Sequence, residues 1–245
     1  MKYVIRLFTI LLFLAGCISL IQQSTENNRL AAEVNRLEAE LGRMSITDAD
    51  RVYLVEIEAP NIPPEVVERL ERVWQFRCYL PPGYDFMHLS GGGRVTKEGL
   101  YQSGGYGSSW GTPKPEAIHQ LLTVSFQKKD DHLQVFYSFS GSGGTTSWSA
   151  FNPNRLDDLV VQKLVSSNQG PRSFNQDTIL QLLKIYDPST AKEEKIAEGK
   201  TLTTYAGGQI VLSPKSREPV LTQLRSGETP NDFDPSWIAT EASSE

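Results

Sequence analysis

Residues 121–127 (LLTVSFQ) and 133–140 (LQVFYSFS) carry the clearest fold signal in the chain. Within each segment, apolar residues such as Val124 and Phe126 alternate with polar ones, a pattern typical of strands. The segments are separated only by residues 128–132 (KKDDH), and so short a connection joins antiparallel neighbours. The sequence therefore predicts a β-hairpin within a β-rich domain.

Strand patterns also occur on both sides of this hairpin. The segments predicted as strands are residues 51–58 (RVYLVEIE), 74–80 (WQFRCYL), 84–89 and 209–212. Residues 179–186 fit a strand or a helix equally. Residues 65–73 place Val66, Val67, Leu70 and Val73 on one helical face. This order predicts an α+β domain over residues 48–225, with an antiparallel sheet and one or two helices.

Two glycine-rich stretches interrupt these elements, and we expect both to be loops. Residues 90–112 contain eight glycines among 23 residues, and residues 140–147 form a second Gly/Ser-rich stretch. Four aromatic residues lie in or beside them: Tyr101, Tyr106, Trp110 and Trp148. Such rings on small-residue loops form contact surfaces for proteins and stack on sugars, so these four are candidate ligand contacts. The alternative is that they cover an otherwise open sheet.

The N-terminus predicts a membrane anchor at residues 1–21. Lys2 and Arg6 precede an apolar run, and this charge pattern predicts a cytoplasmic N-terminus with the remainder extracytoplasmic, on the periplasmic side. Residues 3–21 are long enough for a spanning helix. Residues 14–17 (LAGC) instead resemble the bacterial lipobox, which implies a cleaved signal peptide and lipidation of Cys17 as a lipoprotein. Both interpretations remain open.

Residues 20–44 predict a helical, coiled-coil stalk. Two positions of its heptads form a seam in which six of eight residues are apolar: Leu20, Asn27, Val34 and Leu41 at one position, and Gln23, Leu30, Leu37 and Met44 at the other. Charges of alternating sign support a long helix. The seam favours weak self-association, whereas a solvated spacer helix is the alternative.

Charge distribution defines the C-terminal tail and excludes one class of partner. Residues 226–245 contain five carboxylates and no Lys or Arg, which accounts for the whole net charge of −5. We expect this acidic tail to be disordered. Phe233 and Trp237 form the basis of an alternative, a short docking segment. Because the rest of the chain is formally neutral, with no basic patch, nucleic acid is not an expected partner.

No motif predicts a catalytic or metal site. Residues 107–111 (GSSWG) match the G-x-S-x-G pattern around Ser109, which makes a serine hydrolase the alternative function. The pattern requires a strand before and a helix after the serine, but Pro113 and Pro115 follow it. The three histidines are scattered, so no metal or cofactor is expected.

The anchor, residues 28–34 (NRLAAEV) and residues 76–83 (FRCYLPPG) together resemble uncharacterised membrane-anchored proteins of planctomycete-type bacteria. That resemblance implies no activity. The expected function is therefore a non-enzymatic binding or assembly module of the cell envelope, with the membrane and an envelope protein or glycan as partners, or alternatively a glycan-binding lipoprotein.

Overall fold

The computed structural model describes residues 23, 44–57, 70–129, 132–139, 142–148, 152, 154–196 and 199–240. The chain divides into two units, residues 1–44 and 45–245, and both β-sheets of the fold belong to the second unit. The predicted anchor and, apart from Gln23 and Met44, the predicted stalk lie outside the described residues. Among the residues that are described, no helix has the length and apolar character needed to cross a membrane.

Sheet A is antiparallel, and within the described residues it has six strands in the order β10-β1-β2-β6-β7-β8. Its strands are β1 (Val52–Glu56), β2 (Arg72–Leu80), β6 (Ile118–Lys128), β7 (Leu133–Phe139), β8 (Ser142–Trp148) and β10 (Arg172–Phe174). The predicted hairpin is confirmed, because β6 pairs antiparallel with β7 through to Lys128 opposite Leu133.

Sheet B has eight strands among the described residues, in the order β14-β11-β13-β3-β4, with β12 on β13, β5 on β3 and β9 on β11. Its strands are β3 (Phe86–Thr96), β4 (Gln102–Ser103), β5 (Tyr106–Trp110), β9 (Val160–Lys163), β11 (Ile179–Tyr186), β12 (Lys192–Lys195), β13 (Thr201–Pro214) and β14 (Ile238–Ala239). All of these pairings are antiparallel except that of β11 with β14.

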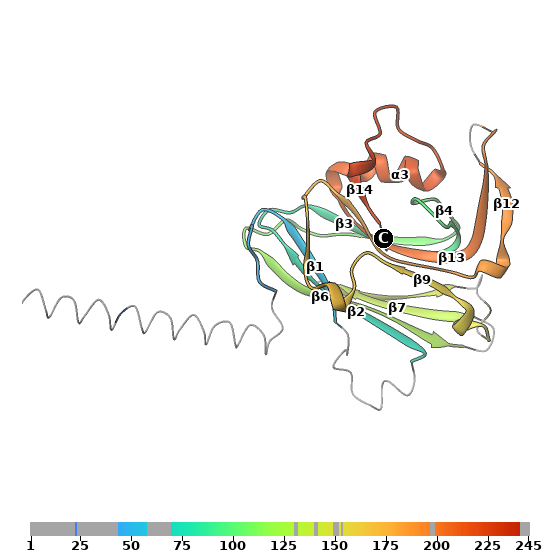
Figure 1. Ribbon diagram of the computed structural model, residues 1–245, viewed down its shortest axis with the longest axis horizontal. Coiled ribbons are helices and arrows are strands. Elements are labelled where there is room, and N and C mark those ends of the chain that lie inside the picture. The colour runs from blue at the N-terminus through green and yellow to red at the C-terminus, as the bar shows by residue number, and fades with distance from the viewer. Residues whose placement is uncertain are drawn as a thin grey trace, which may run out of the picture. The chain divides into compact units, whose positions relative to one another are not determined.

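Sheets A and B pack face to face, and a helix covers the outer face of sheet B (Figure 1). That helix is α3 (Glu218–Ser226), and short 3-10 turns lie at Leu156–Asp158, Ser167–Gln169, Pro188–Thr190, Lys215–Arg217 and Pro235–Trp237. The main core lies between the sheets, where alternate residues of each strand point inward, as Trp74, Phe76 and Cys78 do on β2. A smaller core joins Leu89 and Val211 of sheet B to Leu221 of α3.

The two glycine-rich stretches are strands rather than the predicted loops. Residues 90–112 contribute the second half of β3 together with β4 and β5, and β8 begins at Ser142. Gly92 of β3 pairs with Gly208 of β13, and the buried Trp148 indole lies against both. A Cβ on Gly92 would collide with the indole Cδ1 and Cγ, and one on Gly208 would lie 2.5 Å from Cη2. These glycines therefore make room for a large ring, a role that the general preference of glycine for loops does not reveal.

Other predictions also need correction. Residues 179–186 form a strand, β11, so the helical alternative is wrong. Residues 65–69 of the predicted helix lie outside the described residues. Its last two residues, Arg72 and Val73, already belong to β2 rather than to a helix. The helix that the structure does describe, α3, begins near the end of the predicted domain.

The acidic tail is ordered up to Thr240, contrary to the prediction of disorder over residues 226–245. Ile238 and Ala239 form β14, which pairs parallel with β11. Trp237 is fixed because the Arg217 guanidinium lies 3.9 Å from its ring centroid, and Phe233 meets Trp237 edge-on. The composition indicated disorder, but the two aromatic side chains supply packing contacts that hold this segment in place. Residues 241–245 lie outside the described residues.

We predict that Gly92→Ala destabilises the fold by about 1–3 kcal/mol, because the added methyl group overlaps the Trp148 indole. Gly105→Ala is the matched control, since a Cβ there meets nothing within 4 Å. Trp148→Ala alone should cost about 3–5 kcal/mol. Urea unfolding of a double-mutant cycle provides the measurement: the cost of Gly92→Ala should largely vanish in the Trp148→Ala background. An undiminished cost would show that the indole is not what the glycine accommodates.

Candidate ligand-binding cleft

The structure separates the four aromatic residues that sequence reasoning grouped. Trp148 is 1 % exposed and belongs to the core between the sheets. Tyr101 follows β3 and lines a hollow beside α3. Tyr106 and Trp110 lie on β5 and are 56 % and 54 % exposed. For Trp148 the geometry agrees with the alternative interpretation, a ring that covers a sheet. Of the four candidate ligand contacts, only Tyr106 and Trp110 lie together on one exposed strand.

A cleft of about 550 Å³ lies where β5 ends sheet B and β8 ends sheet A. Its lining combines glycines with hydroxyl-bearing side chains: Ser90, Gly92, Gly93, Gly105, Tyr106, Gly107, Tyr137, Gly144, Thr145, Thr146 and Ser147. A volume of this size is in the range of small-molecule sites, about 300–1,000 Å³. The two glycine-rich stretches of the sequence therefore form facing walls of one cleft.

Tyr137 of β7 lies between these two walls. A Cβ on Gly144 of β8 would lie 3.1 Å from the Tyr137 hydroxyl oxygen, and one on Gly107 of β5 would lie 3.8 Å from it. The glycines on either side thus leave space for the phenol. Sequence reasoning missed this tyrosine, because nothing in residues 133–140 indicates which face of the hairpin meets the second glycine-rich stretch.

Two buried polar side chains lie on the inner face of β3 next to the cleft. Ser90 and His88 are both 1 % exposed, and no described residue forms a hydrogen bond with Ser90 Oγ or His88 Nε2. The His88 ring packs 5.0 Å from the Tyr137 ring, centroid to centroid. Burial lowers the pKa of His88 to about 4, so the imidazole is neutral at pH 7. Ser90 lines the cleft and is a polar group available to a ligand there.

The cleft is uncharged. None of its lining residues is Asp, Glu, Lys, Arg or His, and the described part of the chain holds no group of side chains suited to a metal ion. Uncharged hydroxyls and glycine backbone groups can bind neutral polar ligands by hydrogen bonds, and the lining supplies no charged side chain to pair with a phosphate or carboxylate.

Ser109 lies inside β5, and its position does not fit a nucleophile elbow. The residues after it, 111–117, contain no helix, whereas the elbow requires one immediately after the serine. The histidine opposite Ser109 in the sheet is His88 of β3, which sequence reasoning did not connect with it.

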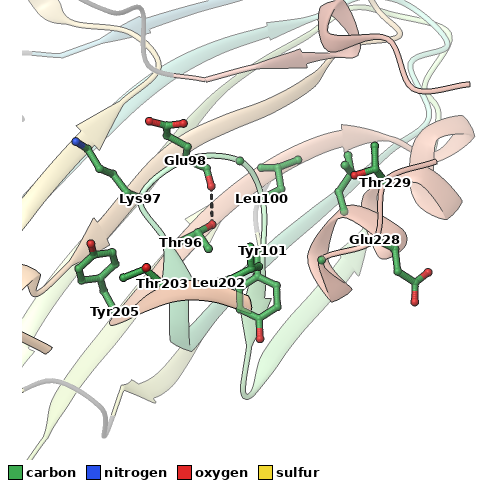
Figure 2. A pocket seen from close by; sticks show the side chains of 13 residues that line it. Thr96, Lys97, Glu98, Leu100, Tyr101, Leu202, Thr203, Tyr205, Glu228 and Thr229 are labelled. Atoms are coloured by element: carbon green, nitrogen blue, oxygen red, sulfur yellow. Dashed lines mark hydrogen bonds between the residues drawn. The ribbon is translucent and has the colours of Figure 1, made fainter. Parts of the chain in front are cut away.

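A second hollow, of about 370 Å³, lies beside α3 and contains Tyr101 (Figure 2). Its rim carries Lys97 and Glu98, so it differs from the cleft in charge. The loop on its rim is held from beneath by Lys184 of β11, whose Nζ donates to the carbonyl oxygens of Thr96, Lys97 and Gly99 at 3.1, 3.3 and 2.7 Å. Burial lowers the pKa of Lys184 to about 8. These contacts account for the buried lysine as a support of the loop.

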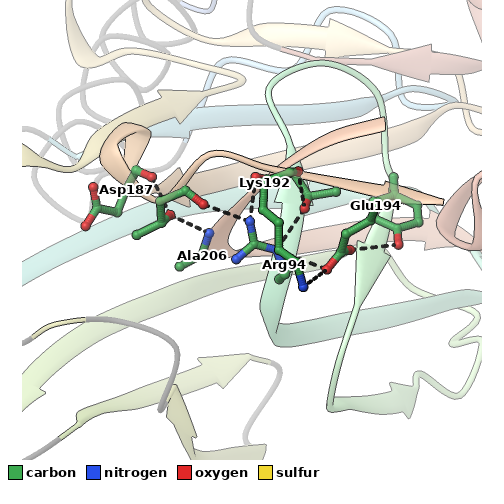
Figure 3. A network of polar contacts seen from close by, with 8 residues as sticks. Arg94, Asp187, Lys192, Glu194 and Ala206 are labelled. Carbon is green, nitrogen blue, oxygen red and sulfur yellow. Dashed lines mark hydrogen bonds and ion pairs between the residues drawn. The ribbon is translucent and has the colours of Figure 1, made fainter. Parts of the chain in front are cut away.

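A polar network centred on Arg94 of β3 includes Glu194 (Figure 3), and Glu194 in turn positions Tyr101. Arg94 Nε donates to Thr204 Oγ1 at 2.8 Å and lies 3.2 Å from Glu194 Oε1, and Arg94 Nη2 donates to the Thr190 carbonyl at 2.8 Å. Glu194 Oε2 in turn accepts from the Tyr101 hydroxyl at 3.4 Å. This half-buried network ties β12 to β3 within sheet B and includes Tyr101, so we assign Tyr101 to it rather than to the cleft.

Comparison with protein-family models, with curated proteins and with solved structures finds no match to this chain.

We predict that His88 makes stability depend on pH. Its pKa is about 4 in the fold and about 6.5 in an unfolded chain, so protonation favours unfolding. The contribution is complete above pH 6.5 and is lost as the pH falls towards 4, by about 2 kcal/mol at pH 5. Urea unfolding at pH 7 and pH 5 should show this loss in the wild type but not in His88→Leu. A His88→Leu variant with the same pH dependence as the wild type would contradict the assignment.

Proposed function

We propose that this protein is a non-enzymatic binding module of the cell envelope, anchored by residues 1–21 with its globular domain extracytoplasmic. The cleft between β5 and β8 is its ligand site, and the ligand is a neutral, hydroxyl-rich molecule such as a segment of a glycan chain. The observation that supports this most is a cleft of about 550 Å³ whose lining is rich in hydroxyls and lacks charge.

Chemical matching favours a glycan over other ligands. Ser90, Tyr137 and Thr146 offer hydroxyls that both donate and accept, as sugar hydroxyls do. Ser90 Oγ, which has no partner among the described residues, gains most from such a ligand because a buried hydroxyl without a hydrogen bond costs free energy. The phenol of Tyr137 adds an apolar surface against which a sugar ring can pack.

We predict that Thr146→Glu weakens binding of neutral oligosaccharides at least tenfold, equivalent to about 1.4 kcal/mol. Thr146 lines the cleft, and a carboxylate there adds volume and a charge that must be desolvated. Chitohexaose and cellohexaose are the probes, measured by isothermal titration with the full-length chain in detergent. Thr229→Glu makes the same change in the second hollow and should leave binding unaltered. The proposal fails if neither probe binds the wild type, or if Thr229→Glu is the variant that weakens binding.

We also predict that Cys17→Ser distinguishes the two forms of the anchor. If Cys17 is lipidated, the variant loses acylation and accumulates as an uncleaved precursor. If residues 3–21 form a spanning helix, the variant keeps the wild-type mass and remains in the membrane fraction. Mass spectrometry of the purified chain and membrane fractionation measure both outcomes. Recovery of wild type and variant alike in the soluble fraction, uncleaved, would contradict anchoring altogether.

A further inference from the structure

The free edge of β5 has unused backbone hydrogen-bonding groups. β5 pairs with β3 on one side, and no described strand pairs with its other side. Along this ladder Gly111 N donates to the Phe86 carbonyl at one end, and Gly92 N donates to the Gly105 carbonyl at the other. Because bonded and non-bonded pairs alternate in an antiparallel ladder, the N–H and C=O groups of Gly107 and Ser109 point to β3. Those of Tyr106, Ser108 and Trp110 point away from it.

Several other edges of the same molecule are protected, whereas β5 and β8 (SGGTTSW), the free edge of sheet A, carry no charge. β12 reads KEEK and carries a charge at every position, while β14 and β10 have only two and three residues. Charge and shortness are the usual devices that prevent edge-to-edge pairing. β5 reads YGSSW, without charge or proline, and carries the two most exposed large apolar side chains of the described residues, Tyr106 and Trp110.

The edge is self-complementary. Tyr106 and Trp110 lie two residues on either side of Ser108 and, by strand alternation, on the same face as it. If two copies pair antiparallel about Ser108, Tyr106 of each lies directly opposite Trp110 of the other. All three outward-pointing residues then find partners, which gives about six backbone hydrogen bonds and two aromatic cross-strand pairs. One ring is already fixed, because the Arg225 guanidinium lies 3.7 Å from the Tyr106 centroid.

We propose that β5 is a homodimer edge at which a second copy of this chain pairs antiparallel, with the twofold axis at Ser108. The uncharged strand has no like charges to oppose this arrangement, and such an isologous contact closes on itself. Five residues from each copy form a contact smaller than the standard stable interface of about 1,600 Å², so the dimer is weak and forms at high local concentration. The inference does not depend on which ligand occupies the cleft.

Cysteine cross-linking tests the proposed register. Pairing about Ser108 places residue 107 of one copy opposite residue 109 of the other in a non-hydrogen-bonded pair, about 4.5 Å apart between Cα atoms, which a disulfide can bridge. Gly107 accepts a Cβ without a clash, its nearest neighbour being the Tyr137 hydroxyl at 3.8 Å. The two variants are Gly107→Cys and Ser109→Cys, in full-length chains carrying Cys17→Ser, and Cys78 is buried. We expect an oxidised dimer when the two variants are mixed and little when either is oxidised alone.

Edge charge identifies the strand involved. Adding Ser108→Lys to both cysteine variants places two like charges at the twofold axis and should reduce the cross-linked yield at least tenfold. Ser147→Lys adds the same charge to β8, the free edge of sheet A, and should leave the yield unchanged. The Ser108→Lys and Ser147→Lys chains should both still unfold cooperatively in urea.

Three outcomes overturn the proposal: no cross-link from mixed, folded variants; equal cross-linking by the single variants; or loss of the cross-link with Ser147→Lys rather than Ser108→Lys. If a cysteine variant does not fold, the cross-linking experiment is replaced by sedimentation velocity of the full-length chain in detergent. The wild type should then sediment faster as concentration rises and Ser108→Lys should not. Equal behaviour of the two chains would likewise overturn the dimer.

Discussion

The contact of the Trp148 indole with the glycines of two central strands governs the arrangement of the sandwich. The ring comes from the end of β8, the edge strand of sheet A, and reaches Gly92 and Gly208 in sheet B. It is 1 % exposed and also meets Phe126 of β6 edge-on, with 5.3 Å between ring centroids. Because the indole occupies space that side chains at 92 and 208 would fill, one aromatic residue fixes how the edge of one sheet lies over the middle of the other. The cleft lies immediately beside this contact, with Gly92 in its lining.

The sequence predicts much of the β-rich domain because inward-facing residues alternate along its strands. The hairpin of β6 and β7 and the first two strands follow from local pattern alone, whereas the pattern of residues 179–186 fitted a helix as well as the strand β11. Glycine misleads where its reason is non-local. The chain positions 92, 208 and 148 meet only after three strands have been placed in two sheets, so residues 90–112 have a loop-like composition although most of them are extended. The tail misleads for a similar reason, since Trp237 and Ile238 are two apolar residues in an acidic stretch whose partners, Arg217 and β11, lie elsewhere in the chain.

The candidate site was less accessible to sequence reasoning than the fold. The two glycine-rich stretches do meet, and Tyr106 and Trp110 are exposed, but Tyr101 belongs to a different hollow and Trp148 to the core. Tyr137, Ser90 and His88 carried no local signal, because an ordinary strand residue becomes a site residue only through what the opposite sheet places against it. The free edge of β5 was equally hidden. A segment predicted as a loop is not expected to form the edge of a sheet. Which of its backbone groups point away from β3 can be assigned only from the register with β3.

The cleft and the exposed edge share a physical origin. Glycine and serine at β5 and β8 leave the space between the sheet edges open, and the absence of charge keeps that space suited to neutral polar groups. The same composition removes the usual protection of an edge strand, since a lysine or glutamate on β5 would border the cleft as well as guard the edge. By contrast, β12 carries a charge at all four positions, and two of them, Lys192 and Glu194, belong to the Arg94 network. If the cleft is the ligand site, an uncharged β5 edge that is free to pair is the expected consequence of a lining without charge. In this fold, the proposed ligand binding and the proposed self-association would depend on the same few residues.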